Sequence, residues 1–266
     1  MNSMPQLTDA TLTLDKRVAV LTFNRHDVRN ALTGTHLVDD IVDTVNWANS
    51  NKEVSVLVLT GAGSAFSAGG NIKDMAEREN DFAGDVAELE ERYRRGIQRI
   101  PLVLQKAEMP VIAAVNGPAI GAGFDVANMC DLRIASNKAK FGETFVNLGI
   151  IPGDGGAWFL QRLIGYQRAA ELTFSGRVID AVEARELGIV LEVVESEQLL
   201  PRALAMAAEM ASKPAASLRL TKRLMKMAQR QELPDFLDLC AAFQGMCHNH
   251  PEHLEAVNAM LEKLGK

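Results

Sequence analysis

The sequence predicts an α/β fold that ends in a helical region, and three observations support this prediction. Short apolar runs rich in β-branched residues, such as 54–59 and 111–115, are typical of strands buried on both faces. Stretches with helical periodicity lie between such runs, so strand and helix alternate through the middle of the chain. Beyond residue 196 the pattern is mostly helical. We therefore predict a core over residues 1–196 and a C-terminal helical region over 197–266.

Length and composition fit one large globular unit. The chain has 266 residues, of which 47% are hydrophobic and 23% charged, enough for a substantial core. Its formal net charge of -6 argues against a broad nucleic-acid-binding surface. No apolar run reaches the roughly 18 residues of a membrane span, and the N-terminus lacks the pattern of a signal peptide. Three cysteines without paired spacing favour reduced thiols. We expect a cytoplasmic protein without nucleic-acid or membrane partners.

The expected strands are short and apolar, and turn residues at 15–17 separate the first two. In chain order they are 11–14, 18–23, 54–59, 111–115, 132–135, 140–142 and 190–194.

The expected helices have apolar residues at helical spacing or begin at capping residues. Thr33 or Thr35 caps the first helix, and Pro214 and Pro234 break the C-terminal region. The segment 81–100 is rich in charge, which indicates one helix with i,i+4 ion pairs on a solvated face. In chain order the helices are about 33–49, 81–100, 124–129, 157–164, 167–173, 181–187 and several beyond 196.

Two glycine-rich turns, within 54–75 and 110–131, each join a buried strand to a helix. Such turns expose backbone N–H groups at a helix N-terminus, where the helix dipole favours negative charge. If the turns face each other, they hold one developing oxyanion between them. A third glycine-rich turn, at 149–156, leads into the helix expected at 157–164.

The first turn does not fit the common nucleotide-binding motifs. Gly61 and Gly63 match the first two positions of G-x-G-x-x-G, but Phe66 occupies the third. No lysine follows a glycine pair as in a P-loop, and no G-x-S-x-G nucleophile elbow occurs. These glycines therefore indicate a different anion site.

Five longer motifs follow one another along nearly the whole chain. They are N-R-H-D-V-R-N-A-L from Asn24, A-F-S-A-G-G-N-I-K-D-M from Ala65, A-A-V-N-G-P-A-I-G-A-G-F-D-V-A-N-M-C-D-L-R-I-A from Ala113, L-G-I-I-P-G-D-G-G from Leu148 and F-S-G-R-V-I-D-A-V-E-A-R-E-L-G-I-V from Phe174. In this order they resemble the crotonase (enoyl-CoA hydratase/isomerase) superfamily. The resemblance implies a crotonase-type spiral of ββα units. It also implies acyl-CoA thioester substrates and assembly through the C-terminal helices into homotrimers or dimers of trimers.

The resemblance also assigns a binding site. The backbone N–H groups of Gly70 and Ala122 are the implied oxyanion donors, which stabilise a thioester enolate. Arg29 or Lys73 is expected to bind a CoA phosphate. The alternative for each is an exposed, unpaired cation. CoA enters as part of the substrate, so no separate cofactor is expected. The histidines near the C-terminus lack the partners of a metal site, so no metal is expected either. The implied substrate-binding residues are Arg29, Ala31, Ala68, Gly69, Asn71, Ile72 and Lys73.

Carboxylates decide the reaction. Asp125, in the first turn of a helix, is the first candidate base, because the dipole favours its ionised form. Family hydratases carry Glu there, which reaches roughly 1.5 Å further, and a second Glu where this chain has Phe145. Glu143 lies on a different face of an extended chain and is not assigned that second role. Asp154 either caps the next helix or takes that role, as in members that hydrolyse β-diketones.

Hydration of a 2-enoyl-CoA in fatty-acid metabolism is the function we expect first. Gly70 and Ala122 hold the thioester oxygen, Asp125 moves a proton or orients water, and Asp154 assists. The charged region after Met75 shapes the acyl pocket. Isomerisation, which needs only one carboxylate, and hydrolytic C–C cleavage with Asp154 are the alternatives. Phe145 also leaves open a different class of function, a low-activity binding or assembly protein.

Overall fold

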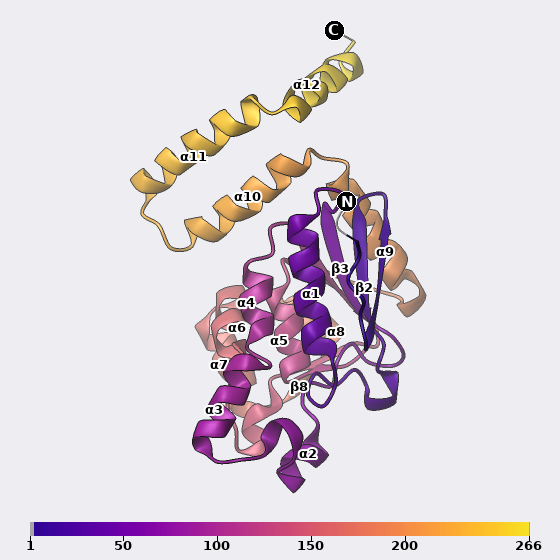
Figure 1. Ribbon diagram of the computed structural model, residues 1–266, viewed down its shortest axis with the longest axis vertical. Helices are drawn as coiled ribbons and strands as arrows, with labels where there is room; N and C mark the ends of the chain where they lie inside the picture. The colour runs from indigo at the N-terminus through magenta and orange to yellow at the C-terminus, as the bar shows by residue number, and fades with distance from the viewer. Residues whose placement is uncertain (1–2, 266) are drawn as a thin grey trace.

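A six-stranded sheet forms the centre of the protein in a computed structural model that describes residues 3–265 (Figure 1). The first two strands, which the sequence predicts on either side of a turn, pair antiparallel, and the others continue the sheet in parallel. Because β3 and β4 are parallel neighbours, the glycine-rich turns that follow them begin at the same edge of the sheet. In sheet order the strands are β1 (Ala10–Asp15), β2 (Val18–Phe23), β3 (Val56–Gly61), β4 (Val111–Val115), β6 (Leu132–Ser136) and β9 (Glu192–Val194).

A second sheet of three short strands lies beside the second glycine-rich turn. It contains β5 (Ala119–Ile120), β7 (Lys140–Gly142) and β8 (Val178–Asp180). Of these three strands, only β7 is predicted from the sequence. The other two are too short to show the alternation that identifies a strand.

Helices cover both faces of the six-stranded sheet. In β3, Leu57 and Leu59 pack into the core that contains α1 (Leu37–Ser50), whereas Val56 and Val58 pack against α9 (Leu199–Ala211). This alternation explains why the whole strand is apolar. The remaining helices of the core are α2 (Ile72–Glu77), α3 (Val86–Arg95), α4 (Arg99–Gln105), α5 (Ala122–Met129), α6 (Gly156–Ile164), α7 (Tyr166–Ser175) and α8 (Ala181–Glu186), with short 3₁₀ turns at η1 (His26–Val28), η2 (Asn80–Phe82), η3 (Thr144–Leu148) and η4 (Ser196–Gln198).

The single helix expected over 81–100 is wrong. The segment divides into η2, α3 and α4, because Gly84 has a φ of +103° and Gly96 ends α3. Asp85 starts α3 with a capping box, in which Glu88 reaches back to the backbone N–H of Asp85. The predicted cap of α1 is also corrected. His36 occupies the cap position, and the Thr35 hydroxyl accepts a hydrogen bond from the Leu37 N–H.

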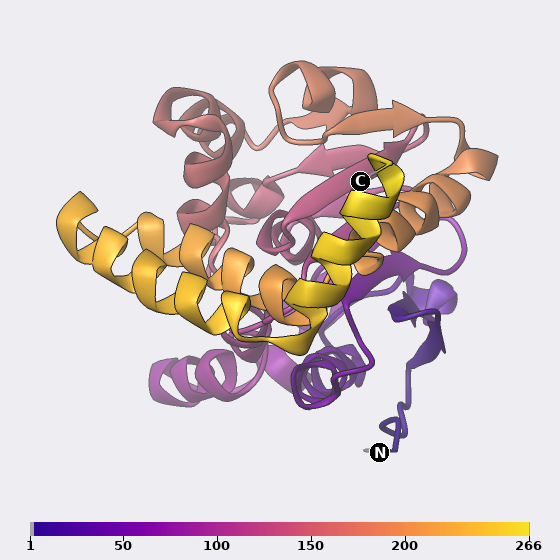
Figure 2. The ribbon, with the colours of Figure 1, turned by 90° about the horizontal axis from the view of Figure 1, so that it is seen from above.

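The last three helices, α10 (Ala215–Ala228), α11 (Leu233–His248) and α12 (Pro251–Lys263), extend along one end of the core (Figures 1 and 2). Since α9 packs on the sheet, the core continues through Ala211 rather than ending at residue 196. Pro214 precedes α10, and Pro234 lies in the first turn of α11, so both predicted breaks are present. Among residues 3–265, no helix combines the length and apolar character of a membrane span.

Candidate active site

The two glycine-rich turns contact each other backbone to backbone. The N–H of Ile120 donates to the Ser67 carbonyl over 3.0 Å. A Cβ on Gly69, whose φ is +76°, would lie 3.0 Å from the Ala122 nitrogen, and one on Gly123 would lie 2.2 Å from the Ser67 oxygen. Glycine is required at both positions, because any side chain would force the turns apart.

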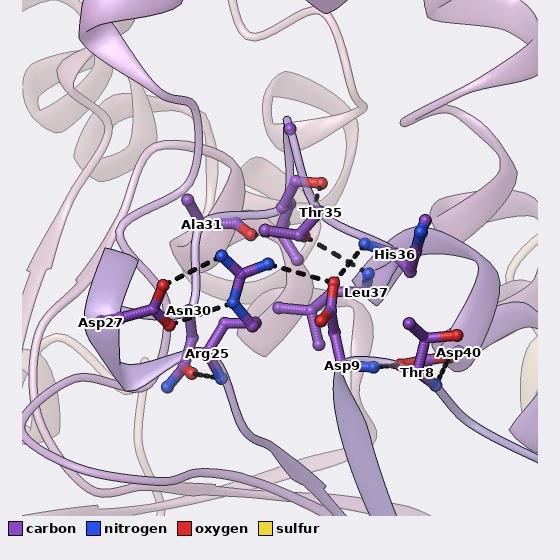
Figure 3. A network of polar contacts seen from close by, with 12 residues as sticks. Thr8, Asp9, Arg25, Asp27, Asn30, Ala31, Thr35, His36, Leu37 and Asp40 are labelled. Atoms are coloured by element: carbon purple, nitrogen blue, oxygen red, sulfur yellow. Dashed lines mark hydrogen bonds and ion pairs between the residues drawn. The ribbon is translucent and has the colours of Figure 1, made fainter.

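A polar network around Arg25 holds the loop that precedes α1 (Figure 3), and Asn30 joins this network to the first turn. Asn30, buried and with a φ of 55°, accepts from the Arg25 N–H and donates to the carbonyls of Ala62 and Ala65. The Arg25 guanidinium pairs with Asp27 and Asp9. These contacts place the loop 29–32 against the first turn, where Leu32 N–H donates to the Gly69 carbonyl.

Gly70, Ala122 and Asp154 line one cavity of about 260 Å³. Within residues 3–265, neither the Gly70 N–H nor the Ala122 N–H donates a hydrogen bond to a protein group. Ala122 is the first residue of α5, where an N–H has no partner within the helix. Other lining residues come from α1, α2, α3, the link between α3 and α4, α4 itself and η3, and include Val38, Met75, Tyr93, Ile97 and Phe145.

Three carboxyl groups are buried together beside this cavity. The exposed fractions of the three residues are low: Asp125 0%, Glu143 1% and Asp154 3%. Within residues 3–265, no N–H or O–H group outside the cluster donates to any of their six oxygens. The Asp125 carboxyl lies within hydrogen-bonding reach of both Glu143 and Asp154, so it forms the centre of the cluster. A contact of this kind is a hydrogen bond only if one of the two groups holds a proton.

The comparisons with known proteins agree with this geometry. A family-wide sequence profile described as enoyl-CoA hydratase/isomerase matches residues 13–266. The chain belongs to the enoyl-CoA hydratase/isomerase family. A crotonyl-CoA hydratase of Syntrophomonas wolfei is 36% identical over 251 residues, which cover 94% of this chain and 93% of that protein. An Escherichia coli protein named 1,2-epoxyphenylacetyl-CoA isomerase is 33% identical and covers 94% of both chains.

Solved structures of family members share the fold. An enoyl-CoA hydratase from Bacillus anthracis superimposes with a TM-score of 0.89 at 31% identity, over 96% of this chain and 97% of that one. A structure from Geobacillus kaustophilus, titled as an enoyl-CoA hydratase subunit, gives a TM-score of 0.86 at 35% identity, with 97% of each chain covered. The predicted crotonase fold is therefore confirmed.

Burial sets the protonation of the carboxyl cluster in this family member. It is the main cause that raises the pKa of Asp125 well above its usual value, and the charges of Asp154 and Glu143 raise it further. Burial also raises the pKa of Glu143 to about 7 and raises that of Asp154, while the hydrogen bond from Asp125 partly opposes both shifts. Burial thus outweighs the helix dipole, on which the expectation of an ionised Asp125 rested.

The two predicted acid–base residues differ in their access to the cavity. Asp154 lines the cavity, whereas Asp125 lies behind it, against the N-terminus of α6. Glu143 was not predicted to take part, because in an extended chain it would lie on a different face. The strand ends at Gly142, and Glu143 turns into η3 with a φ of −84° and a ψ of 70°. The turn Gly121–Ala122 stays close, since Gly121 N–H donates to the Gly142 carbonyl over 2.8 Å.

The implied CoA-binding residues gather at the first turn. Ala68 N–H donates to the Arg29 carbonyl, and the Asn71 side chain caps α2 by accepting from the Lys73 N–H. The side chains of Arg29 and Lys73 are exposed there. Ala31 and Gly69 are buried under the same turn, and Ile72 is 60% exposed at the start of α2. His248 and His253 contact each other at 3.1 Å, and no cluster with the composition of a metal site occurs within residues 3–265.

Proposed function

We propose that this protein is an enoyl-CoA hydratase that stabilises a thioester enolate with the N–H groups of Gly70 and Ala122. The observation that carries the proposal is the shared cavity, in which two free N–H groups and the Asp154 carboxyl lie together. A donor of this type contributes on the order of 3 kcal/mol to catalysis in other enzymes. Relatives named as hydratases at 33–36% identity support the same activity.

The proposed reaction needs one carboxylate at the cavity. Water attacks Cβ of the 2-enoyl thioester, and its proton passes to Asp154. The double-bond electrons move to the thioester oxygen, where the two N–H groups hold the enolate. Asp154 then returns a proton to Cα, so the cluster ends with as many protons as it began. Asp125 supports this role by donating its own proton to Asp154 in a hydrogen bond.

Isomerisation of a 3-enoyl-CoA is the second candidate. Within the described residues, Asp154 is the one member of the carboxyl cluster that lines the cavity, and Phe145 lines it where family hydratases carry a second Glu. One carboxylate shuttles a proton between Cα and Cγ without water. The family description, enoyl-CoA hydratase/isomerase, supports this alternative.

For the substrate, we propose that CoA lies along the first turn, with Arg29 and Lys73 near its phosphates. Both cations are exposed beside the backbone of Ala68 and Gly69. The acyl chain then points toward α3 and α4. Arg29→Ala and Lys73→Ala are expected to raise KM for crotonyl-CoA with little change in kcat.

We also propose a cytoplasmic homotrimer or dimer of trimers that assembles through the C-terminal helices. Apolar side chains on α11 and α12 that are exposed in the single chain support this assembly, among them Leu237, Met246, Leu254 and Met260. The three cysteines are free, which fits a reducing compartment. Light scattering on the purified protein measures the assembly, and a monomer would contradict it.

The activity is tested with crotonyl-CoA and a matching 3-enoyl-CoA. A hydratase removes the absorbance of the conjugated thioester from crotonyl-CoA, whereas an isomerase creates that absorbance from the 3-enoyl ester. A β-diketone CoA ester tests for hydrolytic C–C cleavage. Turnover of neither enoyl ester, across several chain lengths, would reject both leading reactions and leave the binding or assembly function.

A further inference from the structure

Glu143 is the member of the carboxyl cluster that the proposed reaction does not use. It does not line the cavity, yet it is almost fully buried, and within residues 3–265 no donor outside the cluster reaches its oxygens. A buried carboxylate without a donor loses several kcal/mol of solvation and persists only if a proton or a partner compensates it. The Asp125 carboxyl is the neighbouring partner that can supply a proton.

The geometry of the cluster makes Asp125 a shared donor. A single carboxyl proton on Asp125 faces two acceptors, Asp154 on the cavity side and Glu143 on the far side. Three carboxyl groups, two of which lie within hydrogen-bonding reach of the third, Asp125, cannot all be ionised in a buried site, because each negative charge raises the cost of the next. The protons therefore belong to the cluster as a whole.

We propose that Glu143 is a positioning residue that competes with Asp154 for the proton of Asp125 and so sets the pH at which Asp154 becomes a base. This inference rests on the proposed role of Asp154, but the proton sharing itself concerns the free protein. Family hydratases carry a second carboxyl at the cavity, where this chain has Phe145. In this chain Glu143 would be the second titrating carboxyl, placed behind the cavity.

The groups that face the cluster are few. Asp125 extends from α5, Glu143 from the end of β7, and Asp154 from the turn before α6. Tyr93 of α3 packs over Gly153, and its pKa is raised by burial and by the charge of Asp154. No Lys, Arg or His pairs with the three carboxyl groups within residues 3–265. No cation therefore offsets the charge of Glu143.

The test compares the wild type with Glu143→Gln, which keeps the size and the acceptor oxygen but cannot ionise. The wild type should show the infrared band of protonated carboxyl groups at neutral pH, where free carboxyls are ionised. In Glu143→Gln this band should lose its titration step near neutral pH. Glu197→Gln, on the exposed surface of η4, is the matched control and should leave the band unchanged. These measurements need no substrate, so they stand even if the enzyme proves inactive on enoyl esters.

The kinetic arm tests the coupling to Asp154. Glu143→Gln should shift the acid limb of the kcat/KM–pH profile to lower pH by at least about one unit, with kcat on the plateau changed less than about threefold. A simple structural role would lower kcat without moving the limb. A shift below about 0.3 unit would overturn the inference. So would a wild-type spectrum without a protonated carboxyl band between pH 5 and 7, whatever the variant does.

Discussion

Gly156 lies so close to Asp125 that a methyl group on its Cα would fall 2.2 Å from the Asp125 Oδ1 atom. The first residue of α6 therefore fixes the centre of the carboxyl cluster from a different element. The glycine is not required by the backbone, since its φ is not in the left-handed region. It is required by the space that the carboxyl group occupies.

Gly156→Ala is expected to displace Asp125 and to lower kcat/KM at least tenfold. Alanine suits a helix better than glycine by up to about 1 kcal/mol, so the melting temperature should change by only a few degrees. Gly245→Ala is the matched control, because no atom lies within 4 Å of its Cβ position in α11. Steady-state kinetics and thermal melting measure both variants. Equal activity of the two would show that the position of Asp125 is unimportant.

Asp154→Asn is expected to lower kcat at least about 100-fold, because the cavity loses its proton acceptor. Asp125→Asn should lose less, since the asparagine amide still donates to Asp154 as the protonated carboxyl does. Asp238→Asn, exposed on α11, serves as the control. If the loss is larger for Asp125→Asn, Asp125 rather than Asp154 is the base. If neither variant loses tenfold, both residues lie outside the chemistry.

The stability of the protein should fall as the pH rises through the titration of Glu143. Its pKa is raised from the model-peptide value of 4.5 to about 7, so the folded state binds more protons than the unfolded state between these values. The free energy of unfolding therefore decreases with pH, by up to about 1.4 kcal/mol per pH unit for one proton. The free energy of unfolding of Glu143→Gln lacks this decrease, because glutamine does not titrate. In urea unfolding from pH 5 to 8, the stability of Glu143→Gln relative to the wild type should increase with pH. Parallel plots of unfolding free energy against pH for the two proteins would contradict the prediction.

The parts of the site that consist of backbone N–H groups were predictable from the sequence. The glycine-rich turns are readable from the chain, and the family resemblance then assigned Gly70 and Ala122 within them. The structure places both residues at one cavity. The protonation of Asp125 was not predictable in the same way. The helix dipole is a local property, whereas the burial that outweighs it comes from the packing of distant segments around Asp125. The charges that raise its pKa further belong to Glu143 and Asp154, which lie 18 and 29 residues further along the chain.

In the fold, too, features that depend on local sequence were predictable, and features that depend on tertiary packing were not. Buried strands such as β3 were predicted to within two residues at each end, because their apolar runs need only the local sequence. The boundary at residue 196 was less accurate. The helical periodicity of α9 does not say whether the helix packs on the sheet or extends away from it, and Ala203 and Ala207 pack on the sheet.

Arg219→Met is expected to destabilise the attachment of the C-terminal helices by on the order of 2–4 kcal/mol. The Arg219 guanidinium donates to four carbonyls at and beyond the end of α1, those of Ala48, Asn49, Asn51 and Val54. These carbonyls lose their donor in the variant. Urea unfolding measures the change, and Arg230→Met, exposed beyond α10, is the control. Equal stability of the two variants would contradict the anchoring role.

Phe145→Glu is expected to raise hydration relative to isomerisation, because position 145 lines the same cavity as Asp154. A second carboxyl at the cavity lets one group activate water while the other protonates Cα, whereas isomerisation needs only one. Phe145→Gln matches the new side chain in size without the ionisable group. The ratio of crotonyl-CoA hydration to 3-enoyl-CoA isomerisation should rise at least threefold in Phe145→Glu over Phe145→Gln. An equal ratio in both variants would mean that the cavity does not present position 145 to Cα or to water, and that the buried cluster behind Asp154 alone controls the protons.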